Sequence, residues 1–125
     1  VIALGDTWSS GAASALQTSL GAASLGYTVA DWGSPAGTAE FYATTGTASI
    51  TAALAANPDA QWVWLSVGFD DLVNRYPAES GNQIAAANDA NLRTILNSIF
   101  AAAPQVRVVM FAYDYPNYVQ TPACQ

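Results

Sequence analysis

The sequence contains no lysine and no histidine, and its three cations are all arginines. Nine carboxylates against these arginines give a net charge of −6, and only 10% of the residues are charged. An acidic chain repels phosphate backbones and anionic lipid headgroups, so we expect neither nucleic-acid binding nor docking on an anionic membrane. Without histidine and with one cysteine, these residues do not supply the Cys/His ligand set of a zinc site.

Long apolar runs and cysteine pairs are also missing. No stretch approaches the roughly 18 consecutive apolar residues of a transmembrane helix. Cys124 stands alone, and it is either a free thiol or half of a disulfide whose partner lies outside this sequence. The chain begins at Val1 rather than Met, so a signal peptide, where there was one, has already been removed. A lysine-free composition rich in Ala, Ser and Thr fits a secreted, extracellular protein.

The chain is nevertheless rich in core-forming residues. Of its 125 residues 52% are hydrophobic, and they include four Trp and six Tyr, which disordered segments lack. This length and composition predict one domain over residues 1–125.

Short apolar runs alternate with stretches of helical periodicity. The runs predict strands over 1–4, 27–32, 62–67 and 106–113. Apolar spacing predicts a helix around Leu16 and Leu20 that ends at Gly26. It also predicts a helical region over 38–56, interrupted near Gly46, and a helix over 84–100 that follows a polar loop. Strand–helix alternation predicts an α/β fold, a parallel sheet with helices on both faces.

Ligands of such sheets bind at the carboxyl ends of the strands, which directs attention to the loops 5–11, 33–38, 68–71 and 114–118. In the first loop, Thr7 follows a strand and precedes a helix, where backbone N–H groups and the helix dipole favour negative charge. An attacking oxygen and an oxyanion can share that position, although the hydroxyls there can equally cap the helix. The loop lacks the Gly spacing and the Lys-Ser/Thr ending of a phosphate loop, and we expect no cofactor.

Three blocks of the sequence resemble the SGNH/GDSL hydrolase superfamily. Gly5-Asp6-Thr7 with Gly11 matches the spacing of the nucleophile block. The 33–38 loop is similar to the block whose glycine N–H enters the oxyanion hole, and Gly37 is the better candidate for that glycine. Gly68-Phe69-Asp70-Asp71 after a buried strand is similar to the Gly-x-Asn-Asp block. The resemblance covers essentially all 125 residues and implies a flavodoxin-like three-layer sandwich.

Departures from the family pattern are as informative as the matches. The nucleophile position holds Thr7 instead of Ser, and its β-branch crowds the attack path. Asp70 replaces the oxyanion-hole Asn, and an ionised carboxylate accepts hydrogen bonds but donates none. Loss of one oxyanion donor costs about 2.7–4 kcal/mol. The family's Asp-x-x-His block is missing, because the chain has no histidine.

The resemblance implies ester or acetyl-ester hydrolysis, on a small ester or an acylated carbohydrate. Thr7 would take the nucleophile position and Gly37 and Asp70 the oxyanion-hole positions. With its altered residues, we expect this chain alone to be weakly active or inactive. A second hypothesis is that the chain is a pseudoenzyme, which reuses the fold without catalysis. It would then be a binding protein or a structural protein that assembles with copies of itself into a homo-oligomer.

The sheet ends at four strands where a flavodoxin-like sheet has a fifth, so we expect the domain to be incomplete at its C-terminus. A C-terminal segment or a second chain, joined through Cys124, would then complete it.

Further acidic and aromatic residues lie in the same loops. We expect Asp6 and Asp71 to hold loops by accepting hydrogen bonds from backbone amides. The alternative is that Asp6, Asp70, Asp71 and Asp114 form a cluster that binds Ca²⁺ or Mg²⁺. Trp8 and Tyr115 are candidate binding residues that line a pocket, and Trp8 either shapes its mouth or simply packs.

Overall fold

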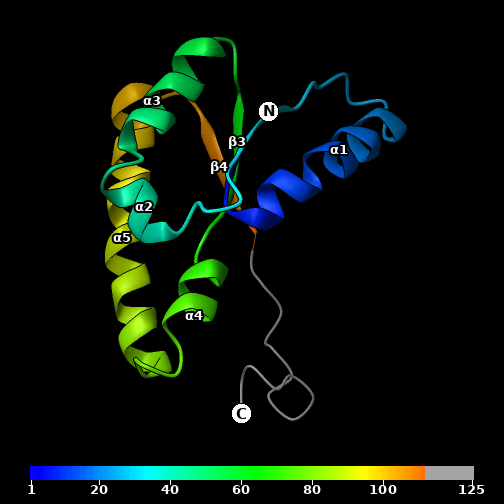
Figure 1. The fold of residues 1–125 in the computed structure, drawn as a ribbon. Coiled ribbons are helices and arrows are strands. Elements are labelled where there is room, and N and C mark those ends of the chain that lie inside the picture. The colour runs from blue at the N-terminus through cyan, green and yellow to red at the C-terminus, as the bar shows by residue number, and fades with distance from the viewer. Residues whose placement is uncertain (112–125) are drawn as a thin grey trace.

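The computed structural model describes residues 1–111, in which strands and helices alternate along the chain (Figure 1). The strands are β1 (Ile2–Gly5), β2 (Ala30–Gly33), β3 (Trp62–Ser66) and β4 (Arg107–Met110). The helices are α1 (Thr7–Ala22), α2 (Ala39–Ala43), α3 (Thr47–Ala56), α4 (Phe69–Arg75) and α5 (Gly81–Ala102). No helix among these residues is long and apolar enough to cross a bilayer.

The four strands form one parallel sheet in the order β2-β1-β3-β4. This order confirms the predicted α/β fold and is that of a flavodoxin-like sandwich. The chain leaves β1 toward β2 on one side and later returns to β3 on the other, so the strand order reverses between β1 and β3. In open α/β sheets, ligands bind outside the carboxyl ends of the strands at such a switch point.

Helices cover both faces of the sheet, as predicted. Alternate strand residues Ile2, Leu4, Val63 and Leu65 point into one buried core, which α2, α3 and α5 complete with side chains such as Tyr42, Ile50, Ile95 and Ile99. Helix α1 lies against β1 and β2 on the opposite face, where Ala3 and Ala13 are buried (Figure 1).

Helix α1 ends differently from the prediction. The predicted stop was Gly26, but the helix ends at Ala22 and the residue with left-handed backbone after its cap is Ser24, at φ 55°. The N–H of Leu25 donates to the carbonyl of Leu20 at 3.1 Å and that of Ser24 to Gly21 at 2.9 Å. These two bonds form a Schellman motif, and the hydrogen bonds of the helix end outweigh the preference for glycine.

The break near Gly46 is confirmed, since α2 and α3 flank it. Helix α4 was not predicted: residues 69–75 were expected to be loop. Its signals are present in the sequence, because Asp70 and Asp71 occupy the first turn and Arg75 the last, as the helix dipole favours. A capping box between Ser80 and Gln83 starts α5 three residues before its first buried apolar side chain, Ile84.

Candidate functional site

The turn after β1 is built around a buried carboxylate. Gly5 has φ 142°, and a Cβ there would lie 1.8 Å from the carbonyl oxygen of Ser66, so only glycine fits. Asp6 is fully buried; its N–H donates to that same carbonyl at 2.8 Å. Asp6 Oδ1 accepts the N–H of Trp8 at 3.0 Å and the hydroxyl of Ser66 at 3.2 Å. Asp6 therefore caps α1 and ties β1 to β3, in the structural role predicted for it.

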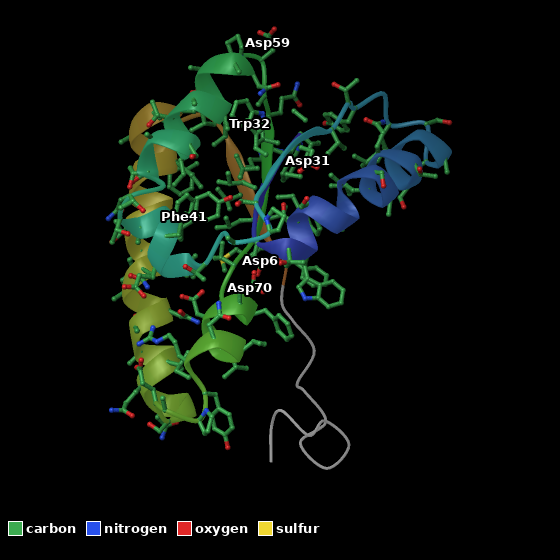
Figure 2. All side chains as sticks on the ribbon, in the orientation of Figure 1. Asp6, Asp31, Trp32, Phe41, Asp59 and Asp70 are labelled. Atoms are coloured by element: carbon green, nitrogen blue, oxygen red, sulfur yellow. The ribbon has the colours of Figure 1, made fainter. Side chains whose placement is uncertain are left out.

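Thr7, the first residue of α1, carries the exposed hydroxyl of this edge. Its Oγ1 lies 2.9 Å from the carbonyl oxygen of Pro35 and 3.0 Å from Oδ2 of Asp70, and it is the donor to both. Three loops far apart in the sequence thus meet at one hydroxyl. In Figure 2, Asp6 and Asp70 are labelled near this edge of the sheet, while Asp59 lies toward the other end.

Gly37 lies in the second of these loops, but its amide is already engaged. Its N–H donates to the carbonyl of Ser34 at 2.8 Å and closes a tight turn. A Cβ at this position would lie 2.7 Å from the Tyr42 ring and 2.8 Å from the Gly5 carbonyl oxygen, so close packing accounts for the glycine. An oxyanion-hole role for Gly37 requires the Ser34 bond to open first.

Asp70 and Asp71 are neighbours in sequence with different tasks. Asp71 is buried, and its two oxygens accept the N–H groups of Ala39 at 2.6 Å and Glu40 at 3.3 Å. It therefore holds the first turn of α2 against α4, as the loop-holding prediction required. Asp70 is half-buried and turns toward the Thr7 hydroxyl.

The acidic residues do not gather into a metal site within residues 1–111, where no group of three or more His, Cys, Asp or Glu could hold a metal ion. The alternative Ca²⁺ or Mg²⁺ cluster is therefore not formed by Asp6, Asp70 and Asp71, and its fourth predicted member, Asp114, lies outside the described residues.

Arg75, the arginine of α4, pairs with Glu79 through Nε at 2.8 Å.

Trp8 directly follows Thr7, and half of its surface is exposed. Its ring meets that of Phe69 edge to face, with centroids 6.1 Å apart. Because Trp8 follows Thr7 and Phe69 precedes Asp70, the two rings form an apolar wall beside the hydroxyl–carboxylate pair. Tyr115, the other predicted aromatic, lies outside the described residues.

Sequence reasoning missed three contributors to this site: the Pro35 carbonyl, Ser66 and Tyr42. The buried Tyr42 hydroxyl donates to the Gly5 carbonyl at 2.9 Å and supports the turn from below. Burial, together with the charges of Asp6 and Asp31, raises the pKa of Tyr42 to about 12, so it stays neutral. No sequence signal identifies Tyr42 or Pro35, because each contributes through a contact across the fold: the Tyr42 hydroxyl donates to the Gly5 carbonyl, and the Pro35 carbonyl accepts the Thr7 hydroxyl.

Comparison of the chain with protein-family models, curated proteins and solved structures finds no match.

Proposed function

We propose that this chain carries the nucleophile region of an SGNH/GDSL-like ester hydrolase, altered so that the chain alone hydrolyses esters poorly or not at all. The observation that supports the proposal is the hydrogen bond between Thr7 Oγ1 and Asp70 Oδ2, at 3.0 Å. It joins the first and third blocks of the resemblance, which are 63 residues apart, at the switch point of the sheet.

In the proposed reaction, Thr7 Oγ1 attacks the ester carbonyl carbon, its proton leaves to a base, and the alcohol departs with a proton. Water then cleaves the acyl-threonine and releases the acid. The Thr7 N–H is the proposed oxyanion donor at the start of α1, since the neighbouring Trp8 N–H already donates to Asp6 Oδ1. Trp8 and Phe69 offer apolar contact for a short acyl or aromatic group.

The same geometry explains the low activity that we propose. Asp70 is the group in hydrogen-bond reach of Thr7, but an aspartate is a weaker base than the histidine that this chain lacks. Its negative charge also repels an oxyanion and cannot donate to it. The Thr7 proton is shared between the Pro35 carbonyl and this carboxylate, which holds the hydroxyl in a resting position.

The test restores the two altered residues and supplies the missing base. The double variant Thr7→Ser, Asp70→Asn is assayed with 4-nitrophenyl acetate, with and without imidazole in the buffer, against the parent chain. We expect imidazole-dependent turnover at least tenfold above the parent, since one restored oxyanion donor is worth about 10²- to 10³-fold. Thr7→Ala combined with Asp70→Asn measures the background that imidazole and the surface contribute.

Thr18→Ala is the matched control, because Thr18 carries another exposed hydroxyl of α1, which within residues 1–111 donates to the Ser14 carbonyl at 2.9 Å. Parent turnover that vanishes in Thr7→Ala but survives in Thr18→Ala would show that the altered site is active as it stands. No gain in the double variant over its Thr7→Ala background would remove the hydrolase proposal.

A further inference from the structure

A hollow of about 330 Å³ lies at the amino edge of the sheet, at the opposite end of the strands from Thr7. The turn before β3 and the start of β4 form its walls, which include Pro58, Asp59, Ala60, Gln61, Trp62 and Arg107. Figure 2 shows Asp59 at this end of the molecule, while Asp6 and Asp70 lie toward the other. The volume is at the lower end of the range for small-molecule sites, about 300–1,000 Å³. The proposed function uses none of the residues around it.

Arg107 is the cation of this hollow, and an aromatic ring holds it in place. Arg107 and Trp62 are partners in the register of β3 and β4, so their side chains stand on the same face of the sheet. The centre of the guanidinium lies 5.1 Å from the centroid of the Trp62 ring. Stacking covers one face of the planar guanidinium and leaves the N–H groups in its plane able to donate. The donors are therefore oriented before any ligand arrives.

Arg107 differs from the other arginines in having no charge partner among residues 1–111. Arg75 and Arg93 each form an ion pair with a carboxylate four residues away, whereas no described carboxylate pairs with Arg107. Asp59, the carboxylate of the same hollow, likewise forms no ion pair in the described part of the chain. The hollow therefore presents a positive and a negative group that do not neutralise each other.

Neutral groups complete the walls of the hollow. The side-chain Oε1 of Gln61 accepts the Tyr27 hydroxyl at 3.2 Å, which leaves the NH₂ group of Gln61 to donate to a ligand. The N–H of Ala60 donates to the carbonyl of Asn57 at 3.0 Å and closes the turn that carries Asp59. Pro58, in the same turn, has a fixed φ and no N–H, so it adds a rigid apolar surface.

We propose that this hollow binds a free amino acid, with its carboxylate on Arg107 and its ammonium group on Asp59. The guanidinium donates two parallel N–H bonds to the carboxylate, and Gln61 donates a third. Pro58 and Ala60 contact a small side chain. A zwitterion is favoured over a simple anion, because the net charge of −6 on the chain repels a ligand that is negative as a whole. A ligand that carries both charges satisfies both unpaired groups at once.

The experiment compares probes that differ only in their charged groups. L-alanine carries both charges, N-acetyl-L-alanine lacks the ammonium group, and L-alaninamide lacks the carboxylate. Binding to the full chain at neutral pH is followed by NMR, through the indole N–H resonance of Trp62. We expect L-alanine to shift this resonance in a saturable way at millimolar concentrations. Each of the other two probes should bind about tenfold or more weakly, because it loses one charge-assisted pair.

Two variants identify which residue meets which charge of the ligand. Arg107→Gln should weaken the binding of L-alanine and N-acetyl-L-alanine but leave that of L-alaninamide unchanged. Asp59→Asn should weaken the binding of L-alanine and L-alaninamide but not that of N-acetyl-L-alanine. Both side chains are exposed, so we expect the far-UV circular dichroism of the two variants to match the parent.

Arg93→Gln and Asp89→Asn are the matched controls, because they make the same charge changes on α5. Both should bind L-alanine as the parent does. The absence of a saturable shift with L-alanine up to tens of millimolar overturns the proposal, and so does an equal loss of binding in Arg93→Gln. Binding of N-acetyl-L-alanine as tight as that of L-alanine would indicate a simple anion site and also overturns it. None of these outcomes bears on ester hydrolysis at Thr7.

Discussion

Replacing Asp71 by Asn isolates the contribution of one buried carboxylate that joins two helices. Asp71 is 1% exposed and accepts the N–H groups of Ala39 at 2.6 Å and Glu40 at 3.3 Å. Asn keeps the volume and one accepting oxygen, but it turns an NH₂ donor toward an amide N–H. The variant therefore loses a charge-assisted bond at a helix N-terminus and leaves two buried donors facing each other.

The expected loss follows from these two contributions. A hydrogen bond to a charged acceptor contributes about 1.5–3 kcal/mol, and a carboxylate at a helix N-terminus adds about 0.3–1 kcal/mol. We expect Asp71→Asn to lower the free energy of unfolding by about 2–3 kcal/mol. At about 4 °C per kcal/mol for a chain of this size, the thermal midpoint falls by about 8–12 °C.

Asp70→Asn provides the control, because it makes the same chemical change one residue away. Within residues 1–111 the carboxylate of the half-buried Asp70 accepts the Thr7 hydroxyl, and an Asn oxygen can accept that bond equally. Its midpoint should move by about 4 °C or less, because the charge in the first turn of α4 contributes at most about 1 kcal/mol. Thermal unfolding followed by circular dichroism measures both variants. Equal midpoints for the two would refute the assignment of Asp71 as the residue that holds α2.

Two further predictions concern the backbone end of α1 and the buried phenol. Ser24→Gly relieves the left-handed conformation at φ 55° and should stabilise the chain by about 0.5–1 kcal/mol in urea unfolding, whereas Ser14→Gly inside α1 should destabilise it by a similar amount. Tyr42→Phe removes the bond to the Gly5 carbonyl and should cost about 1 kcal/mol at neutral pH. The folded-state pKa of Tyr42, about 12, lies above the unfolded value near 10, so its contribution is complete below about pH 10 and is lost as the pH rises through 12. Urea unfolding from pH 8 to 12 should show a steeper loss in the parent than in Tyr42→Phe; parallel curves would contradict the assignment.

Local chemistry allowed most of the fold to be predicted. The apolar run at 62–67 predicted a strand buried on both faces, and β3 occupies residues Trp62–Ser66. One face is buried as predicted, but Trp62 and Trp64 on the other face are only half-buried. The break near Gly46 follows from the same kind of local signal. The cap of α1 was not predicted: the loop hydroxyls were the candidates, but the side chain that accepts from the first turn is that of Asp6. The errors were also local: α4 is a short helix inside a polar stretch, and Ser24 ends α1 two residues before the glycine that composition favours.

Strand ends and helix starts are set by patterns a few residues long, and these patterns were enough to predict which residues reach the carboxyl edge of the sheet. Thr7, Gly37, Asp70 and Asp71 were all predicted to lie there. What each of them contacts depends instead on how distant elements pack. Asp70 faces a hydroxyl 63 residues away while its neighbour Asp71 is buried under α2. Which of two adjacent carboxylates turns inward depends on the packing of α4 against α2, and that contact has no signature in the local sequence.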